Sequence, residues 1–300
     1  MPLDGLDKLV RLTPLMEPGA KSPILFPVAE RKLHWLTKEG DAQPFSSHKA
    51  LVGKGHWCSK PHVLSVVNNT YKLITNRELL VEVEKSLIDN IHPNKLEGVT
   101  IKDKHAYHGR TCYREYVFPK LECDIGAKSP IAFRIVVANS YGGGAIKVLA
   151  GAIEFYCTNG LVTGVFETDY ARHTSGVRID RFGTYIGKTL DRFVTDAEAW
   201  KRWVKTPVEF PKAMELFKSL ALSPTLHEKL VNQYAVEVED RGPNLWSVYS
   251  ALTYYSSHNQ DGFAVKERDG SPSSAATMFK RETEVAKWVR SAAFKQLEKV

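Results

Sequence analysis

The chain contains the stretch Arg134-Ile-Val-Val-Ala-Asn139-Ser140-Tyr141-Gly142-Gly143-Gly144, and Glu154-Phe-Tyr-Cys157-Thr-Asn159-Gly160 follows it closely. Each stretch is an apolar run that ends in small polar residues and glycine. Glycine and asparagine accept the positive backbone φ that tight hairpin turns require. The two stretches therefore predict neighbouring strands joined by hairpin turns, which indicates an antiparallel sheet.

The same pattern extends outward in both directions. Alternation of β-branched and aromatic residues with a period of two predicts strands at 99–107, 111–118, 131–138, 145–156 and 161–167. Before these strands, a helix is expected at 76–91, capped by Asn76. After them, helices are expected at 196–204, 211–222, 223–237, 244–257 and 277–298, with a polar loop at 259–275.

The domain organisation follows from this pattern. Residues 1–60 carry scattered glycine and proline without a sustained period, so we expect an extended N-terminal arm. Residues 61–300 are expected to form one α+β domain, a mostly antiparallel sheet at about 60–170 followed by a helical C-terminal part at 188–300.

Composition narrows the function classes. The 300 residues carry a net charge of +7, which permits nucleic-acid binding without requiring it. No run approaches the roughly 20 apolar residues that cross a bilayer, and the N-terminus does not resemble a secretory signal. We therefore expect a cytoplasmic protein without a membrane partner. The four cysteines stand far apart, which favours reduced thiols over disulfides or a zinc site.

Residues 102–116 form the first candidate site, because basic and aromatic residues alternate across a hairpin with its turn near His108. Single-stranded nucleic-acid sites combine cations that neutralise phosphates with aromatic faces that stack bases. The candidate residues are Lys104, Tyr107, Arg110, Tyr113 and Arg114. The pattern also fits a solvated hairpin whose tyrosines pack on the sheet, which is the commoner outcome.

The glycine-bearing segment 172–188 is the second candidate. Its guanidinium groups can donate pairs of hydrogen bonds to phosphate oxygens. Ion pairs with nearby aspartates would explain these arginines equally well. A groove between this segment and the 102–116 hairpin would be the best nucleic-acid site that the chain offers. The candidate residues here are Arg172, Arg178 and Arg181.

Motifs for catalysis and for metal or cofactor binding are weak. His105, His108 and Cys112 are closely spaced, but the two histidines would point to opposite faces of one strand, so no metal site is expected. Residues 142–144 lack the spacing of a phosphate-binding loop, and no nucleophile elbow occurs. Acidic residues at 154–180 could serve a metal-dependent nuclease, but their spacing is that of ordinary surface carboxylates. We assign no catalytic residue and no cofactor, and we favour a non-enzymatic role.

The sequence also resembles a known family. The resemblance covers about residues 60–295 and is carried by Asn139-Ser140-Tyr141-Gly142, Cys157-x-Asn159-Gly160, Arg172-His173-Thr174 and the helix from Trp246 to His258. On these motifs the chain resembles a phage/plasmid-like family of unknown function, encoded by prophages and conjugative plasmids. The resemblance implies a mobile-element context, near genes for DNA processing or evasion of host defence. It supplies no catalytic residues.

These observations lead to two functional hypotheses. The first is a phage or mobile-element protein that binds single-stranded DNA, as an annealing or recombination accessory that self-associates into a homo-oligomer through exposed sheet edges. The alternative is a non-enzymatic factor that binds and inhibits a host enzyme or defence complex.

Overall fold

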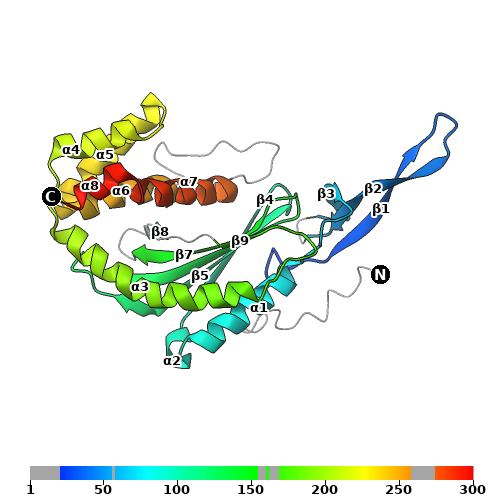
Figure 1. The fold of residues 1–300 in the computed structure, drawn as a ribbon, viewed down its shortest axis with the longest axis horizontal. Coiled ribbons are helices and arrows are strands. Elements are labelled where there is room, and N and C mark those ends of the chain that lie inside the picture. The colour runs from blue at the N-terminus through cyan, green and yellow to red at the C-terminus, as the bar shows by residue number, and fades with distance from the viewer. Residues whose placement is uncertain (1–20, 56–57, 155–159, 162–168, 258–273, 300) are drawn as a thin grey trace.

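The computed structural model describes residues 21–55, 58–154, 160–161, 169–257 and 274–299. Two antiparallel sheets occupy the N-terminal two thirds and helices the C-terminal part, so the α+β prediction is confirmed (Figure 1). In the small sheet the order is β1 (Val28–Leu36), β2 (Ala42–Gly53), β3 (His62–Asn68). In the large sheet it is β4 (Thr100–Ala106), β5 (Thr111–Cys123), β6 (Ile131–Ser140), β7 (Ile146–Glu154), β8 (Gly160–Leu161), and β9 (Asp169–Ala171) also pairs with β7.

The large sheet follows the predicted strands closely. Hairpin turns separate β4 from β5 and β6 from β7, and Gly109 and Gly143 adopt positive φ of 82° and 81° in these turns. β5 continues beyond its predicted end, because a register shift between Phe118 and Glu122 lets it resume pairing with β6. Most of the predicted strand 161–167 lies outside the described residues.

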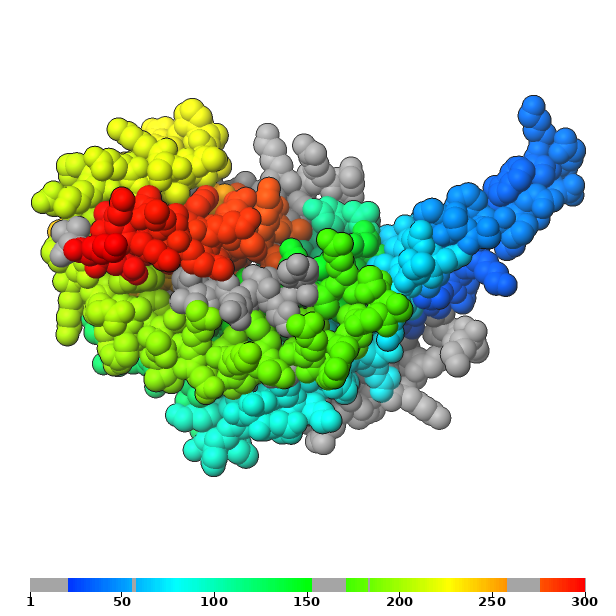
Figure 2. Space-filling model, in the orientation of Figure 1, coloured from blue at the N-terminus to red at the C-terminus, as the bar shows by residue number. Residues whose placement is uncertain are grey.

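The small sheet is formed largely by residues of the N-terminal segment. Residues 28–53 form two long paired strands and not only an extended arm. Their turn at Thr37–Asp41 uses Gly40, whose φ is 92°. The outer part of this ribbon projects from the body (Figures 1 and 2), so it buries no face that would impose an alternating pattern on its sequence.

One face of the large sheet packs against α1 (Asn76–Asn90) and α3 (Arg181–Lys205), with the short α2 (Pro93–Leu96) beside them. Phe133 of the sheet lies 5.3 Å from Phe193 of α3 between ring centroids. Thr75, not Asn76, caps α1 through a reciprocal capping box with Glu78.

α3 begins well before its predicted start at 196. The first turns of α3 lie in the glycine-bearing segment 172–188, and one of its glycines serves close helix packing. A Cβ added at Gly187 would lie 3.0 Å from the Asn90 side chain of α1. Glycine at this position therefore allows α1 and α3 to approach each other.

The C-terminal helices are α4 (Phe210–Ser219), α5 (Pro224–Arg241), α6 (Leu245–Ser257), α7 (Ser274–Val289) and α8 (Ala292–Leu297). α6 is buried along nearly its whole length, and Trp246 and Tyr249 belong to the core. The predicted last helix is interrupted, because Ser291 caps a separate α8. α7 lies over the face of the large sheet opposite α1 and α3 (Figure 1). None of the described helices has the length and apolarity needed to cross a membrane.

Candidate nucleic-acid interface

The register of β4 with β5 divides the candidate residues between two faces of the sheet. Lys104 lies opposite Tyr113, and Lys102 lies opposite Glu115. Arg114 lies opposite Asp103. Because successive side chains point to opposite faces of a sheet, the first two pairs face α7 and the third faces α1. The 102–116 hairpin therefore does not present one continuous surface.

Arg114 is not a nucleic-acid contact, which corrects the sequence prediction. Its side chain is fully buried beneath α1, where it donates to Asp103 at 2.7 and 2.8 Å and to Glu84 at 3.0 Å. The Tyr116 hydroxyl donates to the same Glu84 carboxylate at 2.6 Å. Burial alone would lower the pKa of Arg114, but hydrogen bonding to Asp103 raises it. This guanidinium is a permanently charged part of the core.

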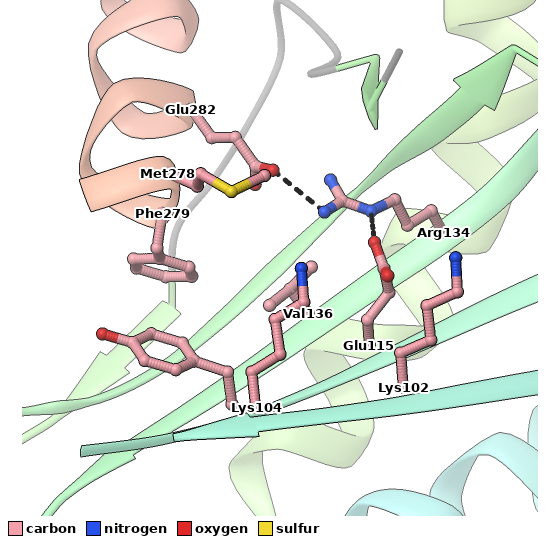
Figure 3. Close-up of a pocket in the computed structure, with 9 residues that line it drawn as sticks. Lys102, Lys104, Glu115, Arg134, Val136, Met278, Phe279 and Glu282 are labelled. Atoms are coloured by element: carbon pink, nitrogen blue, oxygen red, sulfur yellow. Dashed lines mark hydrogen bonds and ion pairs between the residues drawn. The ribbon is translucent and has the colours of Figure 1, made fainter. Parts of the chain in front are cut away.

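A pocket lies between the other face of the sheet and α7. It contains about 390 Å³ of empty space, including its opening to solvent. Figure 3 shows side chains of α7 reaching toward the sheet and lysines of β4 rising toward the same space. The lining residues are Lys102, Lys104, Tyr113, Glu115, Arg134, Val136, Met278, Phe279 and Glu282.

Arg134 lies between two carboxylates in this pocket. It donates to Glu115 on β5 through Nε, and to Glu282 on α7 through Nη2 at 2.9 Å. Burial alone would raise the pKa of Glu115, but Arg134 lowers it, and Lys104 and Lys102 act in the same direction. The trio joins α7 to the sheet and carries one net negative charge.

Aromatic side chains form the apolar wall of the pocket. The ring of Tyr113 lies 5.5 Å from that of Phe279, and the Lys147 ammonium lies 5.7 Å from the Phe279 centroid. Only 8% of Tyr113 and of Phe279 is exposed. Tyr113 is therefore a pocket wall and not the open stacking surface that the sequence suggested.

Two exposed lysines line the mouth of the pocket. Lys102 and Lys104 lie on β4, which is the edge strand of the large sheet, and both face α7. Residues two apart on a strand are about 7 Å apart, comparable with the separation of successive phosphates in an extended single strand. The edge therefore offers two cations at a useful spacing for a polyanion.

The β4–β5 turn continues this edge. Tyr107 and His108 both adopt φ of 53°, which is unusual for residues with a side chain. Tyr107 is 44% exposed, and the Arg110 guanidinium lies 5.2 Å from its ring centroid. The stem of Arg110 also lies close against Gly142, where an added Cβ would approach Arg110 Cδ to 2.8 Å. The turn thus holds an aromatic ring and a cation together at the surface.

The second basic segment does not enter the pocket. Ala171 pairs with Ile146, so the segment that follows β9 leaves the sheet at the same end as the β4–β5 turn. Arg172, Arg178 and Arg181 are exposed there, and Arg178 pairs with Asp180. These arginines follow the end of the large sheet that carries the β4–β5 turn, and they do not line the pocket.

The motif at residues 139–142 has a structural role. The Asn139 amide donates to the Ile74 carbonyl at 3.1 Å and to Asn76 at 2.8 Å, and the Tyr141 hydroxyl accepts from the Asn76 backbone at 2.9 Å. His173 is buried, hydrogen-bonded to the Lys72 carbonyl and stacked on a tyrosine. The contacts of Asn139 and Tyr141 join the end of β6 to the beginning of α1, and His173 joins its segment to residues 71–72.

Sequence reasoning missed most of the pocket. Lys102 could have been found, since it shares a face with Lys104 two residues away. Arg134, Phe279 and Glu282 gave no signal, because an ordinary strand and an ordinary amphipathic helix account for them. Among the residues that the structure describes, no three His, Cys, Asp or Glu side chains are grouped to hold a metal ion.

Comparison with family models matches residues 63–292 to a domain of unknown function. The chain belongs to the DUF932 family. The DUF932 match includes β3, the whole large sheet and the helices as far as the start of α8, and therefore the pocket. The projecting β1–β2 ribbon precedes the matched region. No curated protein and no solved structure matches the chain.

Proposed function

We propose that the protein binds single-stranded DNA along β4 and the β4–β5 turn, over the mouth of the pocket beneath α7. The supporting observation is that two exposed cations, Lys102 and Lys104, lie on the edge strand, and that the turn at the end of this strand holds the exposed Tyr107 ring together with the Arg110 guanidinium. Cations neutralise phosphates, and aromatic rings stack unpaired bases. We further propose that it acts in DNA transactions of a phage or other mobile element, in the host cytoplasm.

Preference for a single strand follows from the shape of the site. The aromatic side chains Tyr113 and Phe279 lie inside a narrow pocket and not on an open surface. A base paired in a duplex cannot reach them without leaving its stack, whereas an unpaired base can turn toward them. A duplex would therefore contact only the lysines and the turn.

Fluorescence anisotropy of a labelled oligonucleotide over a salt series tests the proposal. We expect Lys102→Gln/Lys104→Gln to weaken single-strand binding and to reduce the salt slope by about 1.4, since each single-strand phosphate contact contributes about 0.7. Lys85→Gln/Lys95→Gln is the matched control. It removes the same charge from exposed positions on α1 and α2, on the other side of the large sheet.

The two variants separate a site from a general charge effect. Equal weakening of single-strand binding in both variants would show that net charge, and not a specific site, accounts for the binding. Unchanged binding in the first variant would exclude this edge as the site. Absence of single-strand binding by the wild-type protein at low salt would exclude the function itself.

One observation favours the alternative of a protein-binding factor. Trp35, Leu36 and Phe45 are 53%, 70% and 45% exposed on the projecting ribbon. A two-stranded ribbon is marginally stable by itself, so apolar side chains at such a place suit contact with another protein. The partner in this hypothesis is a host enzyme or defence complex.

Trp35→Ser/Phe45→Ser tests the alternative. Nuclease-treated wild-type protein should retain a stoichiometric host partner that the variant loses. Light scattering on the purified protein distinguishes such a partner from self-association. Retention of the same partner by the variant would exclude the ribbon as its binding surface.

A further inference from the structure

Glu282 has a buried carboxylate oxygen without a partner. Its Oε1 accepts a hydrogen bond from Arg134 Nη2 at 2.9 Å, but its Oε2 has no hydrogen-bond partner among the described residues. Only 3% of the residue is exposed. Buried polar atoms are almost always paired, so an unpaired carboxylate oxygen that lines a pocket indicates a missing donor.

The residues around Glu282 Oε2 limit the kind of ligand that can donate a hydrogen bond to it. Met278 and Phe279 lie beside Glu282 on α7, and Tyr113 completes an apolar wall (Figure 3). The ammonium group of Lys104 rises toward the same space, and Lys102 lines the pocket beside Glu115. These lysines would repel a cationic ligand. A fitting ligand therefore has a flat apolar ring with an N–H group at one edge and an anionic group outside the pocket.

A nucleotide within a DNA strand has this combination. Every nucleobase carries an N–H donor on its pairing edge, a ring face that packs on aromatic side chains, and a phosphate a few bonds away. Met278 has a flexible thioether side chain that can move to admit a ring. Arg134 holds Oε1, which leaves Oε2 to accept from the ligand.

We propose that this pocket accepts one unpaired nucleobase of the bound strand, and that Glu282 Oε2 accepts a hydrogen bond from its N–H edge. The proposal rests on the proposed function, because Lys102 and Lys104 hold the neighbouring phosphates. It adds that the protein contacts a base directly. In this proposal Glu282 recognises the base and Arg134 is the positioning residue that holds Glu282.

Two oligonucleotides and three proteins test the inference. The first oligonucleotide is a dC homopolymer, and the second has the same length with abasic sites at every position. Wild-type protein should bind the homopolymer at least tenfold more tightly than the abasic strand. Glu282→Gln keeps an amide oxygen for Arg134 and places an NH₂ group where Oε2 lies, so it replaces the free acceptor by a donor.

Glu282→Gln should bind the abasic strand as the wild type does, and should lose about tenfold in affinity for the homopolymer. Glu284→Gln is the matched control on the same helix, where the carboxylate contacts Tyr255 and Lys280 outside the pocket. It should bind both strands as the wild type does. Thermal melting checks that all three proteins are folded.

The outcomes distinguish the two proposals. If the wild-type protein binds neither strand, the proposed function fails. If it binds both equally, phosphate binding stands and the base pocket is wrong. If Glu282→Gln keeps the full preference for the homopolymer, a base is bound elsewhere. The comparison of the two strands by wild-type protein needs no variant, so equal binding of the two strands would overturn the inference even if Glu282→Gln fails to fold.

Discussion

Arg114 donates two parallel hydrogen bonds to Asp103 on the adjacent strand, from Nε to Oδ1 at 2.8 Å and from Nη2 to Oδ2 at 2.7 Å. Its third bond goes to Glu84 of α1. The guanidinium thus joins the large sheet to α1 through two buried carboxylates. Arg114, which the sequence pattern suggested as a DNA contact, therefore belongs to a buried network of ion pairs.

Replacing Arg114 tests this role. Arg114→Met should lower the free energy of unfolding by about 3–5 kcal/mol, because it leaves Glu84 and Asp103 buried without their cation. Urea denaturation measures the loss. Arg178→Met is the control, since its pair with Asp180 is exposed and screened by solvent, so the substitution should leave the stability almost unchanged. Equal effects of the two substitutions would contradict a buried network.

The β4–β5 turn gives a prediction that separates stability from binding. Tyr107→Gly removes the strain of positive φ, so stability should change by less than about 1 kcal/mol. Single-strand affinity should nevertheless fall at least fivefold, because the exposed ring that stacks a base is lost. His108→Gly relieves the same kind of strain and keeps the ring. It should therefore bind as the wild type does, and a similar loss in both variants would assign the effect to turn geometry.

His173 makes stability depend on pH. Burial lowers its pKa from the ordinary value of 6.5, against the opposing effect of its hydrogen bond to the Lys72 carbonyl. The unfolded chain therefore takes up a proton on this residue that the folded protein does not. The contribution of His173 to stability should be constant above about pH 6.5 and should fall as the pH drops from there toward the folded pKa.

Urea denaturation at pH 7 and pH 5 measures this dependence. His173→Phe keeps a ring against Tyr71 but cannot titrate, so the decrease between the two pH values should become smaller. His105, whose pKa is also lowered by burial and by His108, should account for a further part. An unaltered dependence in His173→Phe would exclude His173 as a source.

Tyr141 supports the beginning of α1. Its hydroxyl accepts from the buried Asn76 backbone N–H, which has no partner within the helix. Tyr141→Phe should lower the free energy of unfolding by about 1–3 kcal/mol, the cost of an unsatisfied buried donor. Tyr107→Phe removes a hydroxyl from the surface and should change stability little. Similar values for the two substitutions, measured by urea denaturation, would show that the Tyr141 hydroxyl carries no structural role.

Local sequence determined the hairpins of this protein. Residues 131–140 and 146–154 are short apolar runs, and the glycines at 142–144 accept the backbone angles of the turn between them, so neighbouring residues suffice to define both strands and their turn. The helix at 76–90 was equally clear, although its cap lies at Thr75. The ribbon at 28–53 was missed, because a projecting ribbon buries no face and needs no periodic pattern.

Tertiary structure decided which side chains are at the surface. Alternation places Tyr113 and Arg114 on opposite faces of β5, but it cannot say that α1 covers one face and α7 the other. Since helices cover both faces, Arg114 and Arg134 became parts of internal ion pairs. The bond between Arg134 and Glu282 joins residues 148 positions apart. No local pattern encodes such a contact, because it exists only when α7 packs on the sheet, and the candidate base pocket arises from the same packing.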